Sequence, residues 1–359
     1  MQPSLNFSEK IRGFATKVAS RVTRSWRIVA LGAVLIVALS IGLLVFALTP
    51  KASTPSPVAE TPVEKPASSS IFARTLDGVA VADASSTTLL PIAVMVENSA
   101  DAWPLLGPAK ANLVIEAPVE GSITRFMLVF DASATTTQIG PVRSARPYYV
   151  QLADGLGALY AHVGGSPEAL DLLKTLDRVT NYDEYYHGPS FWRSASRGAP
   201  HNVYTSMEKL NAAVVKMELT PPGFSSWTYT DDASATGTQS ATEISVPYQG
   251  IYRASWTYDE GTKMYTRKQG STIQKDADGE IVTARNVVVM ESSVVVLDGV
   301  GRLSVGTIGN GPAKIFHDGQ QFDGIWRRSS GEHLRFETVD GRVIPFARGK
   351  TWISILPKD

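Results

Sequence analysis

The chain has 359 residues, 43% of them hydrophobic, with 34 basic and 34 acidic side chains and no cysteine. The zero net charge argues against a nucleic-acid-binding protein, which usually carries a basic surplus. The lack of cysteine excludes disulfides, thiol catalysis, cysteine-ligated zinc and a lipid-modified cysteine. The length is sufficient for two domains.

A long apolar run follows a basic N-terminal segment, residues 1–27. The run covers Ile28–Leu48, and a helix of this length reaches about 31 Å, the thickness of a bilayer core. Six Lys and Arg side chains, from Lys10 to Arg27, precede it, whereas only Lys51 follows closely. We predict a single-pass transmembrane signal anchor in the cell membrane, with the N-terminus cytoplasmic and the rest extracytoplasmic. The alternative is a cleavable signal peptide, whose apolar region is usually only ~7–15 residues long.

The rest of the chain divides by composition into a stalk and two domains. Residues 49–70 are rich in Pro, Ser and Thr, which favours an extended stalk. For residues 71–218 we predict an α/β domain, a mixed sheet with flanking helices, because apolar strand-like runs alternate with helical segments. We predict a loop-rich junction at residues 219–239 and a β-rich domain at residues 240–359.

Local signals define the elements of the α/β domain. Strands are predicted at 91–98, 113–119, 126–130 and 156–163. One helix is expected to begin at Ser144, with Pro147 in its first turn. A second begins with Ser166 as N-cap and Pro167 as the first helical residue, which makes Ser166 a cap rather than a nucleophile. A third helix is expected where Thr205 and Glu208 have capping-box spacing.

The C-terminal domain reads as strands separated by Asp-Gly turns. The turn pairs are Asp278-Gly279, Asp318-Gly319 and Asp340-Gly341, which favour tight hairpins. Its aromatic side chains, including Trp256, Trp326 and Trp352, have no spacing typical of a glycan-binding platform. We interpret them, with Trp227 of the junction, as packing residues.

Two arginine-rich stretches carry the candidate chemistry. "IGPVRSARPYY" holds Arg143 and Arg146, and "FWRSASRGAPHNVY" holds Arg193 and Arg197. Between residues 91 and 205 there are 8 Lys and Arg against 11 Asp and Glu, so these clusters are local features. The first stretch lies where a helix is expected to begin. The backbone amides of a helix N-terminus and the planar guanidinium groups of arginines can both donate hydrogen bonds to a phosphate or carboxylate.

Other polar side chains complete the predicted anion site. It comprises Arg125, Arg143, Arg146, His162, Arg193, Arg197, His201 and Asn202. The alternative is that these arginines are structural, with the acids Glu116 and Glu120 pairing with Arg125 or Arg143. The histidine spacings match no zinc signature, so no metal site is predicted, and the sequence does not indicate a cofactor.

Several motifs in the same order carry a resemblance. "PIAVMVEN", "EGSITRFMLVF", "IGPVRSARPYY", "ALYAHVGGSPEAL", "SRGAPHNVYTSMEKL" and "GKTWISILP" together resemble the YerB-like family of bacterial lipoproteins, over roughly residues 75–358. The resemblance implies two domains and an extracytoplasmic, membrane-anchored protein. Many members are anchored through a lipidated cysteine. Here the Ile28–Leu48 segment takes that place.

The order of elements is also similar to that of the LytR–CpsA–Psr phosphotransferases, which grip a polyprenyl pyrophosphate with arginines. The acidic residues that help to hold magnesium in that family have no match here. Two functions follow. The chain is expected to bind an anionic cell-wall polymer or an envelope partner protein through an arginine-rich cleft. The alternative is a phosphotransferase acting on polyprenyl-pyrophosphate-linked wall polymers.

Overall fold

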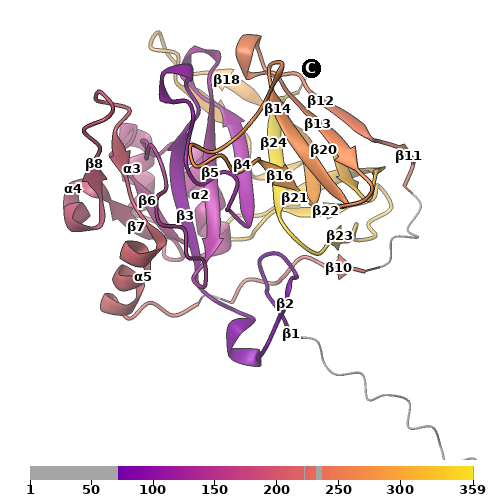
Figure 1. Ribbon diagram of the computed structural model, residues 1–359, viewed down its shortest axis with the longest axis horizontal. Coiled ribbons are helices and arrows are strands. Elements are labelled where there is room, and N and C mark those ends of the chain that lie inside the picture. The colour runs from indigo at the N-terminus through magenta and orange to yellow at the C-terminus, as the bar shows by residue number, and fades with distance from the viewer. Residues whose placement is uncertain (1–71, 222, 232–236, 359) are drawn as a thin grey trace, which may run out of the picture. The chain divides into compact units, whose positions relative to one another are not determined.

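The computed structural model describes residues 72–221, 223–231 and 237–358, which belong to one compact unit, residues 70–359 (Figure 1). The predicted anchor at 28–48 and the stalk at 49–70 lie outside the described residues. Within the described part of the chain, no helix is long and apolar enough to cross a membrane.

Strands greatly outnumber helices in the described residues. The α-helices are α2 (Pro147–Leu156), α3 (Pro167–Leu173), α4 (Glu184–His187) and α5 (Met207–Lys216), and the 3-10 helices are η1 (Ala84–Ser86), η2 (Ala100–Ala102), η3 (Glu120–Ser122), η4 (Gly188–Ser190) and η5 (Gly250–Tyr252). The strands are β1 (Phe72–Ala73), β2 (Ala80–Val81), β3 (Pro91–Glu97), β4 (Leu113–Pro118), β5 (Thr124–Asp131), β6 (Leu159–His162), β7 (Thr180–Asp183), β8 (Trp192–Arg193), β9 (Val203–Tyr204), β10 (Tyr229–Thr230), β11 (Gln239–Ser240), β12 (Glu243–Val246), β13 (Ala254–Asp259), β14 (Met264–Gln269), β15 (Thr272–Ile273), β16 (Thr283–Ala284), β17 (Asn286–Ser292), β18 (Val294–Val296), β19 (Leu303–Val305), β20 (Gly309–His317), β21 (Gln320–Arg328), β22 (Arg335–Glu337), β23 (Phe346–Ala347) and β24 (Thr351–Pro357).

One mixed sheet of 11 strands joins the two halves of the chain. Its order is β11-β21-β20-β17-β24-β4-β5-β3-β6-β7, with β22 beside β21. The last strand, β24, lies between β17 and β4 and is parallel to both. Figure 1 shows β24 beside the strands of the N-terminal half. We expected 71–218 and 240–359 to be separately compact. In the structure strands of both parts join in this sheet, because β24 pairs with β4 through Thr351–Ser354 as well as with β17 of its own half through Thr351–Pro357.

The central sheet is buried on both faces. Along β3 the side chains alternate, so that Ala93 and Met95 belong to one core and Ile92, Val94 and Val96 to the other. Helices α2 and α3 cover the first face. Helix α5 and a smaller sheet, β12 to β16, cover the second. This double cover explains why β3 and β5 read as continuous apolar runs rather than as alternating ones.

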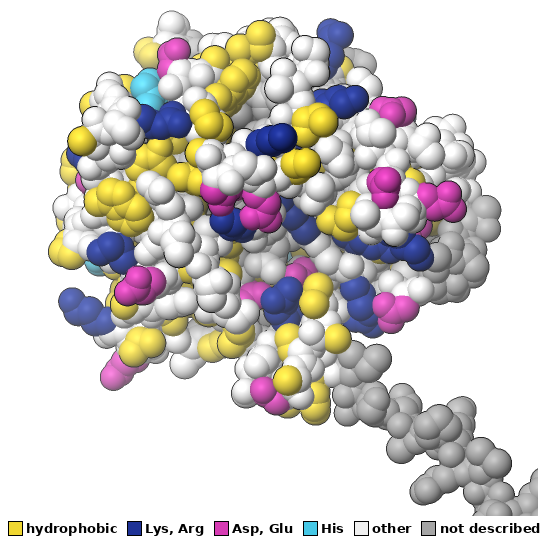
Figure 2. Space-filling view, in the orientation of Figure 1, with side chains coloured by type: hydrophobic (Ala, Val, Ile, Leu, Met, Phe, Trp, Pro, Cys, Tyr) yellow, Lys and Arg dark blue, Asp and Glu magenta, His cyan; other side chains and the backbone are white. Residues whose placement is uncertain are grey.

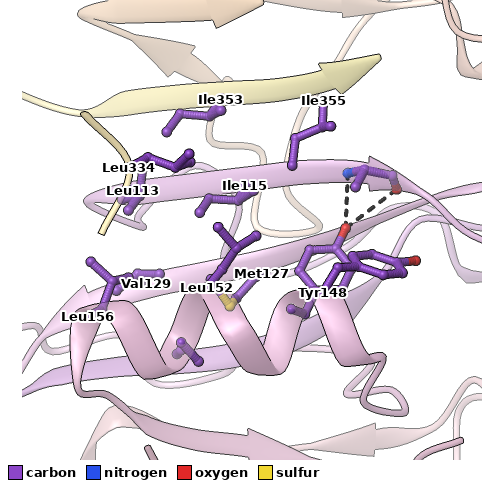
Figure 3. Packing of buried hydrophobic residues seen from close by; sticks show 14 of the residues in the cluster. Leu113, Ile115, Met127, Val129, Tyr148, Leu152, Leu156, Leu334, Ile353 and Ile355 are labelled. Carbon is purple, nitrogen blue, oxygen red and sulfur yellow. Dashed lines mark hydrogen bonds between the residues drawn. The ribbon is translucent and has the colours of Figure 1, made fainter. Parts of the chain in front are cut away.

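Helix α2 packs onto strands from both halves (Figure 3). Its Leu152 and Leu156 point toward the sheet, where Ile115 of β4 and Ile353 of β24 lie in the same cluster. The Tyr149 hydroxyl accepts a hydrogen bond from the Ala117 amide at 2.9 Å. The core on this face therefore also belongs to both halves of the chain.

The helix starts differ in part from the predicted ones. Ser166 is the N-cap of α3, and its hydroxyl accepts from the Ala169 amide, as predicted. Helix α2 begins at Pro147 with Arg146, not Ser144, as N-cap. The residue before a proline favours extended backbone, which fixes the start there. Helix α5 is capped by Ser206, because the Thr205 hydroxyl instead donates to the Ser190 carbonyl.

The hairpin and packing signals of the C-terminal half are observed. Asp318 and Gly319, both with positive φ (51° and 69°), form the turn between β20 and β21, the conformation that an Asp-Gly hairpin turn requires. Trp256, Trp326 and Trp352 are buried. The face in Figure 2 carries Lys and Arg side chains beside Asp and Glu side chains, as the zero net charge leads one to expect.

Candidate functional site

The first arginine stretch lies along the carboxyl end of β3. The Arg143 amide donates to the Met95 carbonyl at 2.9 Å, and the Val163 amide donates to the Arg143 carbonyl at 3.1 Å. The backbone of residue 143 thus bridges the ends of β3 and β6. Arg146 follows as the N-cap of α2. This position agrees with the prediction that the arginines lie where a helix begins.

Glu97, the last residue of β3, is the centre of the site, and our sequence analysis did not select it. Its carboxylate is buried, with one oxygen 3.5 Å from Arg143 Nε and the other 2.9 Å from His201 Nδ1. The Ser99 hydroxyl donates to it at 2.7 Å. The available signal was a single acid closing the otherwise apolar run "PIAVMVE".

Arg146 is held by an internal carboxylate. Its Nε and Nη2 donate to the two oxygens of Glu120 at 2.6 and 2.9 Å, a bidentate pair. Burial alone would raise the pKa of Glu120, but the hydrogen bonds and charge of Arg146 hold it below its ordinary value. The structural alternative paired Glu120 with Arg125 or Arg143, whereas in the structure Glu120 pairs with Arg146.

Arg125 lies on the same face of the sheet, directly opposite Glu97 in the β3–β5 register. Its side chain is buried, and its Nη1 donates to the Ser144 carbonyl at 2.8 Å. It forms no ion pair with any described carboxylate. Burial lowers the pKa of Arg125, and the positive charges of Arg146 and Arg143 lower it further. Three guanidinium groups therefore share two carboxylates here.

The second arginine stretch only partly reaches this cluster. Its loop touches the cluster where Arg143 Nη1 donates to the Pro200 carbonyl at 3.1 Å, next to His201. Arg193 instead bonds to Glu184 and to Asn202, both at 3.2 Å. Arg197 donates to the carbonyls of Ala102 and Pro104, at 2.5 and 2.7 Å. Both side chains link loops, and no hydrogen bond among the described residues joins either of them to Arg125.

His162 and Glu116 have other partners than those we expected. His162 is fully buried, with ring nitrogens 2.8 Å from the Gly164 carbonyl and 2.8 Å from Asn181 Oδ1. Glu116 lies on the opposite face of the sheet, because Ala117, not Glu116, is the residue opposite Arg125 in the β4–β5 register. It pairs with Arg267 of β14 at 2.9 Å, and both side chains are fully buried.

The arrangement suits ion binding better than covalent chemistry. Among the described residues no three His, Asp or Glu side chains are grouped to hold a metal ion. The cluster offers Arg125, whose Nε and Nη2 form no hydrogen bond with any described residue and are not fully buried. Arg143, Arg146 and His201 surround it.

Comparison with known proteins gives the family. The model of the N-terminal domain of a protein of unknown function, DUF3048, matches residues 76–220, and that of the C-terminal domain matches residues 244–353. The chain is 32% identical over 277 residues to "Putative lipoprotein YerB" of Bacillus subtilis (strain 168), which covers 74% of this chain and 81% of that protein.

A solved structure agrees with this relationship. The crystal structure of YerB from Bacillus subtilis matches with a TM-score of 0.71 and 30% sequence identity, over 80% of this chain and 97% of the other. The resemblance seen in the motifs is thus confirmed, together with a two-domain, strand-rich fold. The chain belongs to the DUF3048 family, of which it contains both domains, and is related to YerB.

Proposed function

We propose that the chain is an extracytoplasmic binding protein of the cell envelope, attached to the membrane by its N-terminal apolar segment. Two observations support this location. The relative YerB bears the name of a lipoprotein. Residues 28–48 here form an apolar run behind six basic side chains, which the positive-inside rule places with the folded part outside. Because the chain has no cysteine, this apolar segment would take the place of a lipid anchor.

The ligand we propose is an anionic group of a cell-wall polymer or an envelope partner, bound at Arg125. The observation that carries this proposal is the buried Arg125 without a carboxylate. Glu97 forms an ion pair with Arg143, and Glu120 forms one with Arg146. The guanidinium charge of Arg125 therefore remains without a carboxylate partner. A phosphate or carboxylate that reaches Nε and Nη2 would gain two charge-assisted hydrogen bonds in a fixed, largely desolvated setting.

The geometry narrows the predicted set of ligand residues. Arg125, Arg143, Arg146 and His201 remain as the anion site. Arg193, Arg197 and Asn202 stabilise the loop beside it, and His162 is buried and hydrogen-bonds to Gly164 and Asn181. Binding is favoured over polyprenyl-pyrophosphate transfer because two of the three arginines that would hold a pyrophosphate are already paired with internal carboxylates.

Calorimetry with inorganic pyrophosphate and phosphate tests the proposal on residues 71–359. We expect Arg125→Lys, which keeps the positive charge but cannot form the bidentate hydrogen bonds of a guanidinium group, to bind pyrophosphate about tenfold more weakly. Arg193→Lys is the matched control and should bind like the parent. Equal binding by both variants, or no binding by the parent at millimolar anion, would refute the site. Turnover of a polyprenyl pyrophosphate would show the phosphotransferase alternative instead.

A further inference from the structure

A groove lies on the other face of the central sheet, between the loop after β3 and the edge of the smaller sheet. Its volume is about 820 Å³, and its walls are Trp103, Pro104 and Leu105 on one side and Gln269, Ser271, Thr272, Ile273, Gln274 and Lys275 on the other. We call it the Trp103 groove. The first wall belongs to the N-terminal family domain and the second to the C-terminal one. Its size is in the range of small-ligand sites.

Trp103 is a fixed aromatic surface in this groove. It is half-buried, its indole Nε1 donates to Asn98 Oδ1 at 2.9 Å, and the Tyr252 ring meets it edge-on at 6.0 Å between centroids. Since the indole N–H is already used within the protein, the part of Trp103 left for a ligand is its apolar ring surface. A ring held in this way loses little entropy when a ligand packs on it.

A buried ion pair orients the amides of the opposite wall. The Arg267 guanidinium bonds to Glu116 through Nη2, while its Nη1 donates to Gln269 Oε1 at 2.8 Å and to Gln274 Oε1. Both amide oxygens are therefore drawn inward. The Gln274 Nε2 group donates to no described residue and is not among the fully buried atoms. It is available as a hydrogen-bond donor to a ligand.

We propose that the Trp103 groove binds a neutral oligosaccharide. The indole surface would pack on the apolar face of a pyranose ring, and Gln274 Nε2 would donate to a hydroxyl or acetamido oxygen. Ser271 and Thr272 are exposed and add hydroxyl groups. The lining residues include no carboxylate and a single cation, Lys275, so the groove does not favour a strongly charged ligand.

A peptide fits these observations less well. The sheet edge at the groove is β15, which has only two residues, Thr272 and Ile273. A peptide that adds a strand to a sheet needs a longer row of backbone groups. Fixed side-chain amides and an aromatic ring, in contrast, are useful to a hydroxyl-rich ring. This proposal is independent of the anion site, because the two sites share no residue.

The test uses a soluble β-1,4-linked N-acetylglucosamine hexamer, titrated into residues 71–359 by calorimetry. We expect Trp103→Ala to bind about tenfold more weakly or not at all, and Trp103→Phe to recover part of the affinity. Trp192→Ala is the matched control, since Trp192 is also half-buried, stacks on Tyr204 and does not line the groove. Gln274→Ala, which leaves Gln269 to accept from Arg267, is the second variant and should also weaken binding.

The melting temperature of each variant separates lost binding from lost folding. Weaker binding by Trp103→Ala and Gln274→Ala at parental melting temperatures supports the proposal. It is overturned if the parent does not bind the hexamer at 5 mM, roughly the weakest affinity of interest, or if Trp192→Ala loses as much affinity as Trp103→Ala. Tighter binding of an extended peptide than of the hexamer at this groove would also overturn it.

Discussion

Replacing Arg267 by methionine is expected to destabilise the protein by about 3–5 kcal/mol, because it would leave Glu116 as an uncompensated buried charge. Glu116 accepts four hydrogen bonds, two from Arg267 at 3.0 and 2.9 Å, one from the Thr124 hydroxyl at 2.8 Å and one from the Trp352 indole at 3.1 Å. The variant retains only the last two. It also loses the contact between the guanidinium and the Trp352 ring, 4.7 Å from its centroid.

Removing both charges should cost less than removing one. In the double variant Glu116→Leu and Arg267→Met no charge is left buried, so its loss of stability should be well below the sum of the two single losses. A coupling free energy of about 2 kcal/mol or more is expected for such a contacting pair. Arg327→Met is the control. Arg327 forms a 3.0 Å ion pair with Glu337 but is 44% exposed, and such pairs contribute about 0–1 kcal/mol.

Urea denaturation of residues 71–359, followed by fluorescence and circular dichroism, measures all four variants. The pair lies between β4 and β14, one strand from each half of the chain, so its loss should lower the midpoint of a single transition for the whole unit. The reasoning would be refuted if the double variant lost as much stability as the two single variants together. It would also be refuted if Arg267→Met lost no more stability than Arg327→Met.

Three further predictions concern other parts of the chain. Burial lowers the pKa of His333 to about 4, so the free energy of unfolding should fall by up to about 3 kcal/mol as the pH drops from about 6.5 to 4. In a pH series of urea midpoints, His333→Gln should flatten this decrease, and an unchanged slope would contradict the prediction. Gly155→Ala should cost about 1–3 kcal/mol, since a Cβ there would collide with the Glu332 carbonyl and overpacking strains a close helix contact. Gly188→Ala, where a Cβ meets nothing within 4 Å, should melt like the parent, and equal melting temperatures for both variants would refute the contact. Protease added to intact spheroplasts should digest the part after residue 70, since the charge asymmetry around 28–48 directs that part outward; full protection would show the opposite orientation.

Local physics made several elements predictable from the sequence. The apolar run of β3, the Ser166-Pro167 helix start and the Asp318-Gly319 turn each depend on residues that are neighbours in the chain. Their energetics are short-range: a cap satisfies an amide three residues away, and a turn needs one permissive backbone conformation. The position of the first arginine stretch at the start of a helix was predictable for the same reason.

The partners of the polar side chains, in contrast, were decided by the tertiary structure. Glu116 pairs with a residue 151 positions away, and Glu97 meets His201 104 positions away. Alternation along a strand tells that two residues share a face, but the strand register and the packing of the second sheet decide which charge lies opposite. The sequence by itself therefore indicated the main strands and helices, whose signals lie between neighbouring residues. Only the assembled sheet, with β24 inserted between β17 and β4, determined that the two halves share one core and that Arg125 was left without a carboxylate, because pairing a buried charge requires contacts that only long-range packing creates.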